Sequence, residues 1–318
     1  MNSGPILFAG SSSEDLAERI LRVPHCGISP GTIYHHQFPS GEWYCQYKEN
    51  IRGADVFLLQ SVKHPANDNL MQLLIMADAA RRASAGRITA IIPYLGYSRQ
   101  DRKDKSRVPI SAKLVMDIIA AAGINRVVTM DLHAPQIAGF TNLPFDHLYF
   151  RPALIEALKD TVINVVVAPD IGAIKRAEEY AKKMNVPLAF ISKQRKNDTT
   201  VEATRFVGDV SGANVLIVDD LTESAGTLIQ AAKVCREHNA SKVYCAVTHL
   251  SLSDVGSVRL EEAWNTKLID LFLCSNTTTK EWDYNYTADR LKIVDVAPLF
   301  AKAIRIITNN QSISTLFD

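Results

Sequence analysis

The chain alternates short apolar runs with segments of helical periodicity over almost its whole length. The apolar runs predict strands at residues 5–10, 56–61, 87–95, 126–132, 164–170, 187–192, 215–220, 243–250 and 268–275. Continuous apolar strands joined by helices are typical of parallel strands that helices cover on both faces. The pattern therefore predicts an α/β fold in which mainly parallel sheets are flanked by helices.

Helical periodicity is clearest in four segments and near the C-terminus. The four segments cover residues 70–83, 110–122, 174–184 and 227–238. In the last of them, apolar residues recur at i, i+3, i+4 and i+7, namely Leu228, Ala231, Ala232 and Cys235. This spacing predicts a helix that packs one stripe on a sheet. The segment "VAPLFAKAIRIITNN" predicts a further helix close to the end of the chain.

The length of 318 residues favours two domains, because domains usually contain about 100–200 residues. A boundary is predicted within residues 145–154, where Pro152 can open a new helix. The prediction is two similar α/β domains, residues 1–148 and residues 149–318. No stretch of identity repeats between them, so the sequence does not demonstrate a duplication.

Composition and charge exclude several classes of protein. The formal net charge of +1 gives no overall field that would attract nucleic acid or acidic membranes. The five cysteines form no C-x-x-C pair, so neither a zinc site nor a disulfide framework is indicated. No secretory leader and no apolar run of about 20 residues are present. We therefore expect a reduced, cytoplasmic protein.

Two adjacent carboxylates interrupt the apolar run "VLIVDD". Asp219 and Asp220 stand where the strand is expected to end, and ligands of open parallel sheets bind beyond that end. Adjacent like charges resist burial, so an ordinary turn does not explain them. Paired carboxylates are good acceptors for sugar hydroxyl groups or for a hydrated Mg²⁺.

The residues after this pair favour a phosphate group. Small residues expose backbone amides, Gly226 permits close approach, and a helix N-terminus follows with its partial positive charge. Hydroxyl groups come from Thr222, Ser224 and Thr227. Together with the carboxylates, these groups suggest a phosphorylated sugar as ligand. A Ser/Thr-rich helix cap with solvated acids is the other interpretation, and a nucleotide loop of the form G-x-x-x-x-G-K-[ST] is absent.

This stretch resembles the 5-phosphoribosyl-1-pyrophosphate signature of proteins with the type I phosphoribosyltransferase fold. Longer segments narrow the resemblance: residues 67–115, "DLHAPQIAGF", "APDIG" and "SISTLF" are very similar to ribose-phosphate pyrophosphokinases of the phosphate-activated class. The resemblance covers nearly the whole chain. It implies two phosphoribosyltransferase-like domains, self-association into hexamers, Mg²⁺ as cofactor, and ATP and ribose 5-phosphate as substrates. The implied reaction moves the β,γ-diphosphoryl group of ATP to the 1-hydroxyl of ribose 5-phosphate.

By this resemblance, ribose 5-phosphate binds to the acidic pair and the loop after it. The residues concerned are Asp219, Asp220, Thr222, Glu223, Ser224, Ala225, Gly226 and Thr227. Family members usually have Asp-Thr where this chain has Glu223-Ser224. Both changes keep the chemistry, although the longer Glu223 could crowd the sugar or the phosphate.

The resemblance also assigns residues to ATP. The basic segment "RQDRKDKSR" supplies Arg99, Gln100 and Asp101, and His133 follows another predicted strand. The segment "HHQFPSGEW" is implied to contact adenine in a neighbouring subunit's site, through residues Phe38, Ser40 and Glu42. Ser40 replaces an acid or amide of the family, which puts the selectivity for the nucleotide in doubt. A solvated charged loop and a plain Pro-Gly turn are the alternatives.

Metal binding and catalysis are implied at other strand ends. His133 and Asp170 match residues that help to hold Mg²⁺ and the ATP phosphates. Lys193 and Arg195 match residues of a catalytic loop that stabilise charge during transfer. Between them, Gln194 replaces an arginine of the family.

Regulation is the last property that the resemblance implies. Arg52, Arg82, Ser84, Ser312 and Ser314 fall in segments that form an intersubunit site for activating inorganic phosphate and inhibitory ADP. Ordinary surface polarity explains them equally well. Two other functions stay open: a non-catalytic regulatory subunit associated with the synthetase, and a phosphoribosyltransferase that consumes its product.

Overall fold

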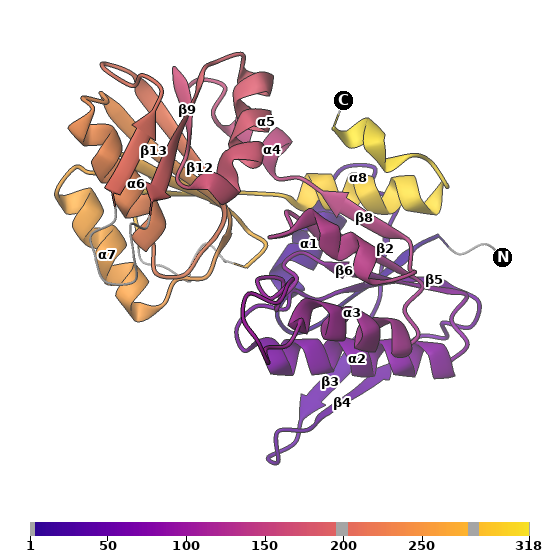
Figure 1. Cartoon of the computed structure of the whole chain (residues 1–318). Helices are drawn as coiled ribbons and strands as arrows, with labels where there is room; N and C mark the ends of the chain where they lie inside the picture. Colours follow the sequence, from indigo (N-terminus) through magenta and orange to yellow (C-terminus); the bar gives the residue numbers. More distant parts are fainter. Residues whose placement is uncertain (1–3, 195–202, 279–285, 318) are drawn as a thin grey trace. The chain divides into compact units, whose positions relative to one another are not determined.

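The computed structural model describes residues 4–194, 203–278 and 286–317. The fold divides into two compact units, and Figure 1 traces the chain through both. Unit 1 contains residues 1–150 and 295–318, and unit 2 contains residues 151–294. The first boundary lies two residues from the predicted one. The last segment differs from the prediction, because residues 295–318 cluster with unit 1 and not with the second domain.

Unit 1 is built on a sheet of six strands. In spatial order they are β2 (Ser29–Pro30), β1 (Ile6–Ala9), β5 (Asp55–Leu59), β6 (Arg87–Ile92), β7 (Arg126–Met130) and β8 (Phe145–Leu148). All five pairings between them are parallel. The helices of this unit are α1 (Glu14–Arg22), α2 (Ala66–Arg82), α3 (Ser111–Ala121) and α8 (Ala297–Thr308), with short 3₁₀ helices η1 (Pro135–Phe140) and η3 (Ile313–Leu316).

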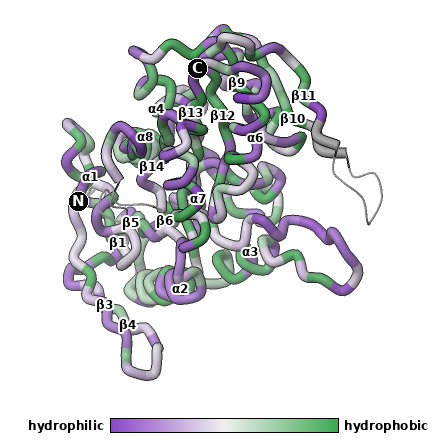
Figure 2. The backbone as a smooth tube through the Cα atoms, turned by 90° about the vertical axis from the view of Figure 1, so that its left-hand side faces the viewer, coloured by the Kyte–Doolittle hydropathy of each residue, from purple (hydrophilic) through white to green (hydrophobic). Residues whose placement is uncertain are grey.

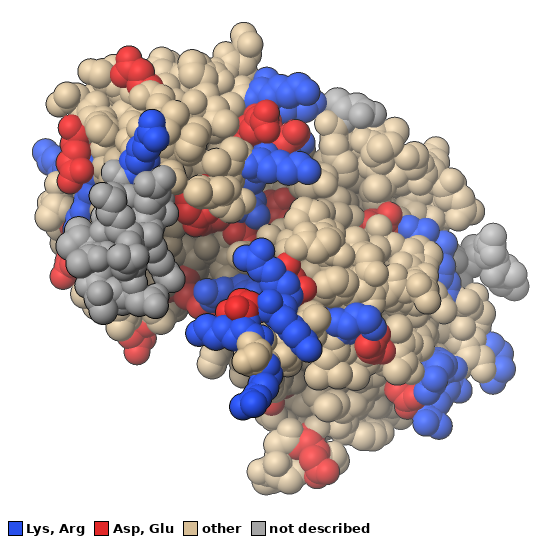
Figure 3. All heavy atoms as spheres, in the orientation of Figure 1, with Lys and Arg blue, Asp and Glu red and all other residues tan. Residues whose placement is uncertain are grey.

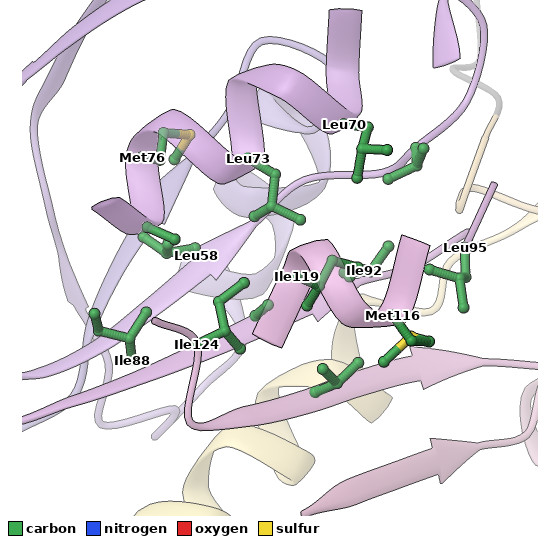
Figure 4. Close-up of a cluster of buried hydrophobic side chains, with 14 of the residues drawn as sticks. Leu58, Leu70, Leu73, Met76, Ile88, Ile92, Leu95, Met116, Ile119 and Ile124 are labelled. Atoms are coloured by element: carbon green, nitrogen blue, oxygen red, sulfur yellow. The ribbon is translucent and has the colours of Figure 1, made fainter. Parts of the chain in front are cut away.

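Helices cover both faces of this sheet. In Figure 4, α2 and α3 direct Leu73, Met76 and Ile119 onto strand residues such as Leu58 and Ile92, and these five side chains are fully buried. On the other face, α8 packs against α1. The apolar face of α8 therefore explains why the C-terminal segment belongs to unit 1.

A separate antiparallel hairpin, β3 (Ile33–Gln37) and β4 (Trp43–Tyr47), projects from unit 1 (Figure 2). Its inner face packs on α2, where the Tyr47 hydroxyl donates to the Met76 carbonyl oxygen at 2.8 Å. Its outer face carries exposed aromatic rings, including Tyr34 and Tyr44. The alternation of inward and outward side chains is that of a strand with one covered face.

Unit 2 is built on a sheet of seven strands. Their order is β11 (Ala203–Val207), β10 (Leu188–Gln194), β9 (Val165–Ala168), β12 (Asn214–Thr222), β13 (Lys242–Leu250), β14 (Leu271–Ser275) and β15 (Leu291–Val294). The edge strand β11 is antiparallel to β10, and the other pairings are parallel. The helices are α4 (Arg151–Ala157), α5 (Ile174–Met184), α6 (Gly226–Glu237) and α7 (Asp254–Asn265), with the 3₁₀ helix η2 (Ile171–Ala173).

The predicted stripe of α6 forms part of the core of unit 2. Leu228, Ala231, Ala232 and Cys235 are each at most 1% exposed. They pack with apolar residues of β12, β13 and α7. The α/β architecture, with mainly parallel sheets flanked by helices, is confirmed.

All nine predicted strands and all five predicted helices are present. The strands that the apolar pattern missed are β2, β3, β4, β8, β11 and β15. Most are short or partly exposed, so their sequences lack a continuous apolar run. Among the described residues, no helix combines the length and apolar composition needed to cross a membrane.

Candidate active site

The acidic pair lies in the last third of β12, at the carboxyl end of the unit 2 sheet. β12 continues two residues beyond the predicted strand end, and Thr222 pairs with Leu250 of β13. Asp219 is partly covered and Asp220 is buried. The Asp220 amide donates to Asp219 Oδ1 at 2.9 Å. The strand thus fixes the backbone on which both carboxylates stand.

Arg176 of α5 bridges the two aspartates. Its Nη1 atom lies 3.0 Å from Asp219 Oδ1 and 3.2 Å from Asp220 Oδ1. The side chains of Arg176, Asp219 and Asp220 are 21%, 15% and 6% exposed, so solvent screens these ion pairs only weakly. We did not predict Arg176 from the sequence. One local signal was available, because a cation in the first turn of a helix opposes the helix dipole.

The electrostatics of this cluster reflect the burial of Asp219 and its closeness to a second carboxyl group. The pKa of Asp219 is raised to about 8, first by burial and then by the charge of Asp220. The Arg176 guanidinium acts in the opposite direction but does not offset both effects. A group that donates hydrogen bonds to the carboxylates would relieve this repulsion.

The loop after β12 has a fixed shape. The Ala225 amide donates to Thr222 Oγ1 at 3.1 Å, and Ala225 itself has a left-handed φ of 56°. The Glu223 carbonyl oxygen accepts from the Ser253 amide at 2.9 Å and from Ser253 Oγ at 3.2 Å. Helix α6 then begins at Gly226, and its first amides have no acceptor within the helix. The loop therefore presents a preformed helix N-terminus.

Two residues of α7 act on this loop, and the sequence reasoning missed both. A Cβ added at Gly256 would lie only 2.1 Å from the Glu223 carbonyl oxygen, so this glycine allows α7 to approach the loop. The Arg259 guanidinium lies near Gly226, since a Cβ there would be 3.5 Å from Arg259 Nη1. In the part of the chain that the structure describes, Arg259 has no ion-pair partner. It adds positive charge beside the N-terminus of α6.

Asp170 follows β9, the neighbour of β12, and so lies at the same edge of the sheet. Its Oδ1 atom accepts from the Ala173 amide at 3.0 Å, which caps η2. The described residues contain no group of three His, Cys, Asp or Glu side chains suited to a metal ion. A single carboxylate oxygen nevertheless suits Mg²⁺, which usually keeps several water ligands.

In unit 1, the residues predicted for ATP follow β6 and β7, which are adjacent strands. Gln100 Oε1 accepts from the Ser111 hydroxyl at the start of α3. Asp101 Oδ2 accepts from Gln136 Nε2 at 2.6 Å, which links the loop after β6 to η1 after β7. Arg99 and His133 are exposed. Figure 3 shows Lys and Arg side chains gathered where this basic loop runs beside α3.

The predicted adenine-contacting residues lie at the tip of the β3–β4 hairpin. Ser40 Oγ donates to Glu42 Oε2 at 2.7 Å, and Phe38 is 45% exposed with its ring 5.1 Å from that of His36. Figure 1 and Figure 2 both show this tip projecting away from the loop beside α3. Unit 1 therefore does not bring Phe38, Ser40 and Glu42 together with Arg99.

The remaining predicted residues are placed only in part. Lys193 belongs to β10, where its backbone pairs with Thr204, and Arg195 lies outside the described residues. Arg52 and Ser84 lie on neighbouring loops at the amino ends of β5 and β6, because the Gly53 amide donates to the Ser84 carbonyl oxygen at 2.8 Å.

The other two regulatory segments have local partners. Arg82 pairs with Asp78 at 2.6 Å on the exposed face of α2. Ser312 Oγ lies 2.7 Å from Ser314 Oγ near η3. These contacts do not test the regulatory role of the five residues, which stays a prediction.

Comparison with known proteins identifies the family. The family model for the N-terminal domain of ribose phosphate pyrophosphokinase matches residues 5–123, and the model for the phosphoribosyl synthetase-associated domain matches residues 201–318. A ribose-phosphate pyrophosphokinase of Porphyromonas gingivalis is 43% identical over 98% of this chain and 97% of its own length. One of Caldanaerobacter subterraneus is 45% identical over the same shares of the two chains.

A solved structure agrees with these sequences. The phosphoribosylpyrophosphate synthetase of Mycobacterium smegmatis superimposes with a TM-score of 0.88 at 37% identity, covering 96% of this chain and 99% of that one. The similarity thus extends over both units. On these grounds the chain belongs to the ribose-phosphate pyrophosphokinase family.

Proposed function

We propose that this chain transfers the β,γ-diphosphoryl group of ATP to the 1-hydroxyl of ribose 5-phosphate, which yields 5-phosphoribosyl 1-diphosphate and AMP. The observation that carries the proposal is the site on β12. Two carboxylates precede a fixed loop and a helix N-terminus, in a chain that is similar over its full length to enzymes named for this reaction.

The sugar phosphate binds in unit 2. Asp219 and Asp220 accept hydrogen bonds from the ribose hydroxyl groups, and the loop from Thr222 to Thr227 donates to the 5-phosphate through its amides and hydroxyl groups. Arg259 adds positive charge next to that phosphate. This arrangement leaves C1 of the sugar free to react.

ATP binds through unit 1. Arg99 holds phosphate oxygens, Gln100 and Asp101 fix the loop around the nucleotide, and the hairpin residues Phe38, Ser40 and Glu42 contact adenine in a neighbouring subunit. Self-association, with a hexamer as the expected assembly, is therefore part of the proposal.

Mg²⁺ is the proposed cofactor, and when bound it neutralises charge on the transferred diphosphoryl group. Asp170 offers the carboxylate oxygen that Mg²⁺ prefers as ligand. The His133 imidazole is a less usual ligand for this ion, so its better role is to bind a phosphate oxygen or a water of the metal shell.

The chain itself contributes mainly positioning and positive charge. The anomeric oxygen attacks the β-phosphorus in line, and Lys193 and Arg195 stabilise the charge that develops on the transferred group. We expect Lys193→Ala to lower kcat on the order of 100-fold while the KM values for both substrates change little, because its contact forms in the transition state. Steady-state kinetics test this, and an unchanged kcat removes Lys193 from the mechanism.

The second candidate is a non-catalytic subunit associated with the synthetase. The full-length similarity to named ribose-phosphate pyrophosphokinases favours catalysis over this candidate. Incubation with ATP, Mg²⁺ and ribose 5-phosphate separates the two. Equal amounts of AMP and 5-phosphoribosyl 1-diphosphate are expected; if neither forms with or without added inorganic phosphate, catalysis by this chain is refuted.

The same assay addresses regulation. Activation by inorganic phosphate and inhibition by ADP, through Arg52, Arg82, Ser84, Ser312 and Ser314, are proposed from the resemblance of their segments. Titration with each effector tests them. A cytoplasmic location stays a prediction from the sequence.

A further inference from the structure

Arg176 occupies a position that local rules disfavour. It stands in the first turn of α5, where the helix dipole already supplies positive charge, and no acidic residue accompanies it in that turn. Its guanidinium is only 21% exposed and points at the acidic pair of the neighbouring strand. Such a conflict between residue and position is typical of functional sites.

The composition of the cluster also argues against a purely structural ion pair. One guanidinium nitrogen meets the Oδ1 atoms of two carboxylates, at 3.0 Å and 3.2 Å. A structural pair needs one carboxylate, whereas this guanidinium is shared by two carboxyl groups in a poorly solvated place. Holding two carboxyl groups so close together is costly, and a structural ion pair alone does not require it.

We propose that Arg176 is a positioning residue, which holds the side chains of Asp219 and Asp220 side by side so that both accept hydroxyl groups of the ribose. This inference rests on the proposed function of the β12 site. Without Arg176, the two carboxyl groups would lose the guanidinium nitrogen that both of them contact. One of them would then turn away, and the sugar would lose an acceptor.

The position of the residue assigns it to one substrate. Arg176 contacts the two aspartates proposed for the sugar, whereas Arg99, Gln100 and Asp101, which are proposed for ATP, lie in unit 1. Its removal should therefore affect ribose 5-phosphate and not ATP. We expect Arg176→Gln to raise the KM for ribose 5-phosphate by a factor on the order of 30, with the KM for ATP within about twofold of wild type.

The conservative variant Arg176→Lys separates the effect of the positive charge from the effect of the guanidinium shape. Because a single nitrogen atom bridges the pair, the ammonium group of Arg176→Lys can supply the same charge from a similar place. We expect this variant to recover most of the affinity for ribose 5-phosphate that Arg176→Gln loses. A merely structural guanidinium would show no such rescue.

The matched control is Arg236→Gln in the same unit. Arg236 pairs with Asp270 at 2.7 Å and donates to carbonyl oxygens at the ends of loops, remote from the acidic pair along the sheet. Arg236→Gln should lower the melting temperature and leave the KM values for ribose 5-phosphate and ATP unchanged. If it does not fold, Lys159→Gln, which removes an exposed cation of unit 2, replaces it.

The outcomes separate this inference from the proposed function. If wild type neither turns over nor binds ribose 5-phosphate by calorimetry, the proposed function fails. If wild type is active and folded Arg176→Gln keeps the wild-type KM for ribose 5-phosphate, the positioning role alone is overturned. A KM that rises equally for ATP also overturns it. The selective rise, with rescue by lysine, supports it.

Discussion

At the scale of single residues, the acidic pair brings two carboxyl groups together in a poorly solvated place. Asp219 is covered by protein, touches a second carboxylate and has one guanidinium to compensate. Its pKa of about 8 lies far above the usual 3.8, so the folded state binds a proton at Asp219 more tightly than the unfolded state does.

This shift makes stability depend on pH in a definite direction. Because the folded pKa of Asp219 is raised, the carboxyl group costs little stability below pH 4 and costs progressively more as the pH rises toward 8. Asp219→Asn removes this dependence. We expect urea denaturation to show a free-energy difference, variant minus wild type, that grows by a few kcal/mol from pH 5 to pH 8.

The direction in which this free-energy difference changes with pH tests whether the pKa of Asp219 is raised. A difference that stays constant, or that shrinks as the pH rises, would mean that Asp219 is already ionised in the folded protein. Asp160→Asn, at an exposed position of the same unit, serves as the control.

Sequence patterns predicted some site residues and not others for a physical reason. Asp219 and Asp220 interrupt an apolar strand, and that break is visible in the linear sequence. Arg176 becomes part of the site only because α5 packs on β12, and Gly256 only because α7 packs on the loop. A cation in the first turn of α5 marks Arg176 as unusual, but it does not show which residues Arg176 contacts.

At the scale of elements, the loop between β12 and α6 carries the residues that are proposed to bind the phosphate of the sugar. Its shape depends on the close approach of α7 at Gly256, whereas Gly226 has ordinary space around it. Gly256 lets α7 pack on the loop, whereas Gly226 is proposed to let the phosphate approach the backbone.

Alanine substitutions at the two glycines should separate these tasks. In Gly256→Ala the new methyl group meets the Glu223 carbonyl oxygen, so the loop must move and stability falls by about 1–3 kcal/mol. Gly226→Ala should melt like wild type yet bind ribose 5-phosphate more weakly. Thermal denaturation and calorimetric titration of both variants test this. Equal melting temperatures for the two variants would contradict the assigned packing.

The predictability of the elements follows their burial. The central strands and the helices α2, α3, α5 and α6 carry continuous or periodic apolar residues, and the sequence predicted each of them. The hairpin strands and β8 are half-covered, so their composition resembles that of loops. Their place in the fold depends on contacts with α2 and β7.

At the scale of the whole molecule, the chain leaves unit 1 at residue 150 and returns to it at residue 295. The sequence predicted two α/β domains of similar design, but it could not show that α8 returns to α1. An amphipathic helix has the same pattern whichever sheet it covers. Full-length similarity to named ribose-phosphate pyrophosphokinases then assigns both units to one enzyme family.

Calorimetric titration of ribose 5-phosphate into wild type and Asp220→Asn tests the central claim most directly. Asp220 is buried and contacts Arg176, so loss of its charge removes an acceptor without opening a cavity. The account predicts saturable binding to wild type, binding weaker by a factor on the order of 30 in the variant, and ATP binding unchanged. Equal affinity of the two proteins for ribose 5-phosphate would contradict it.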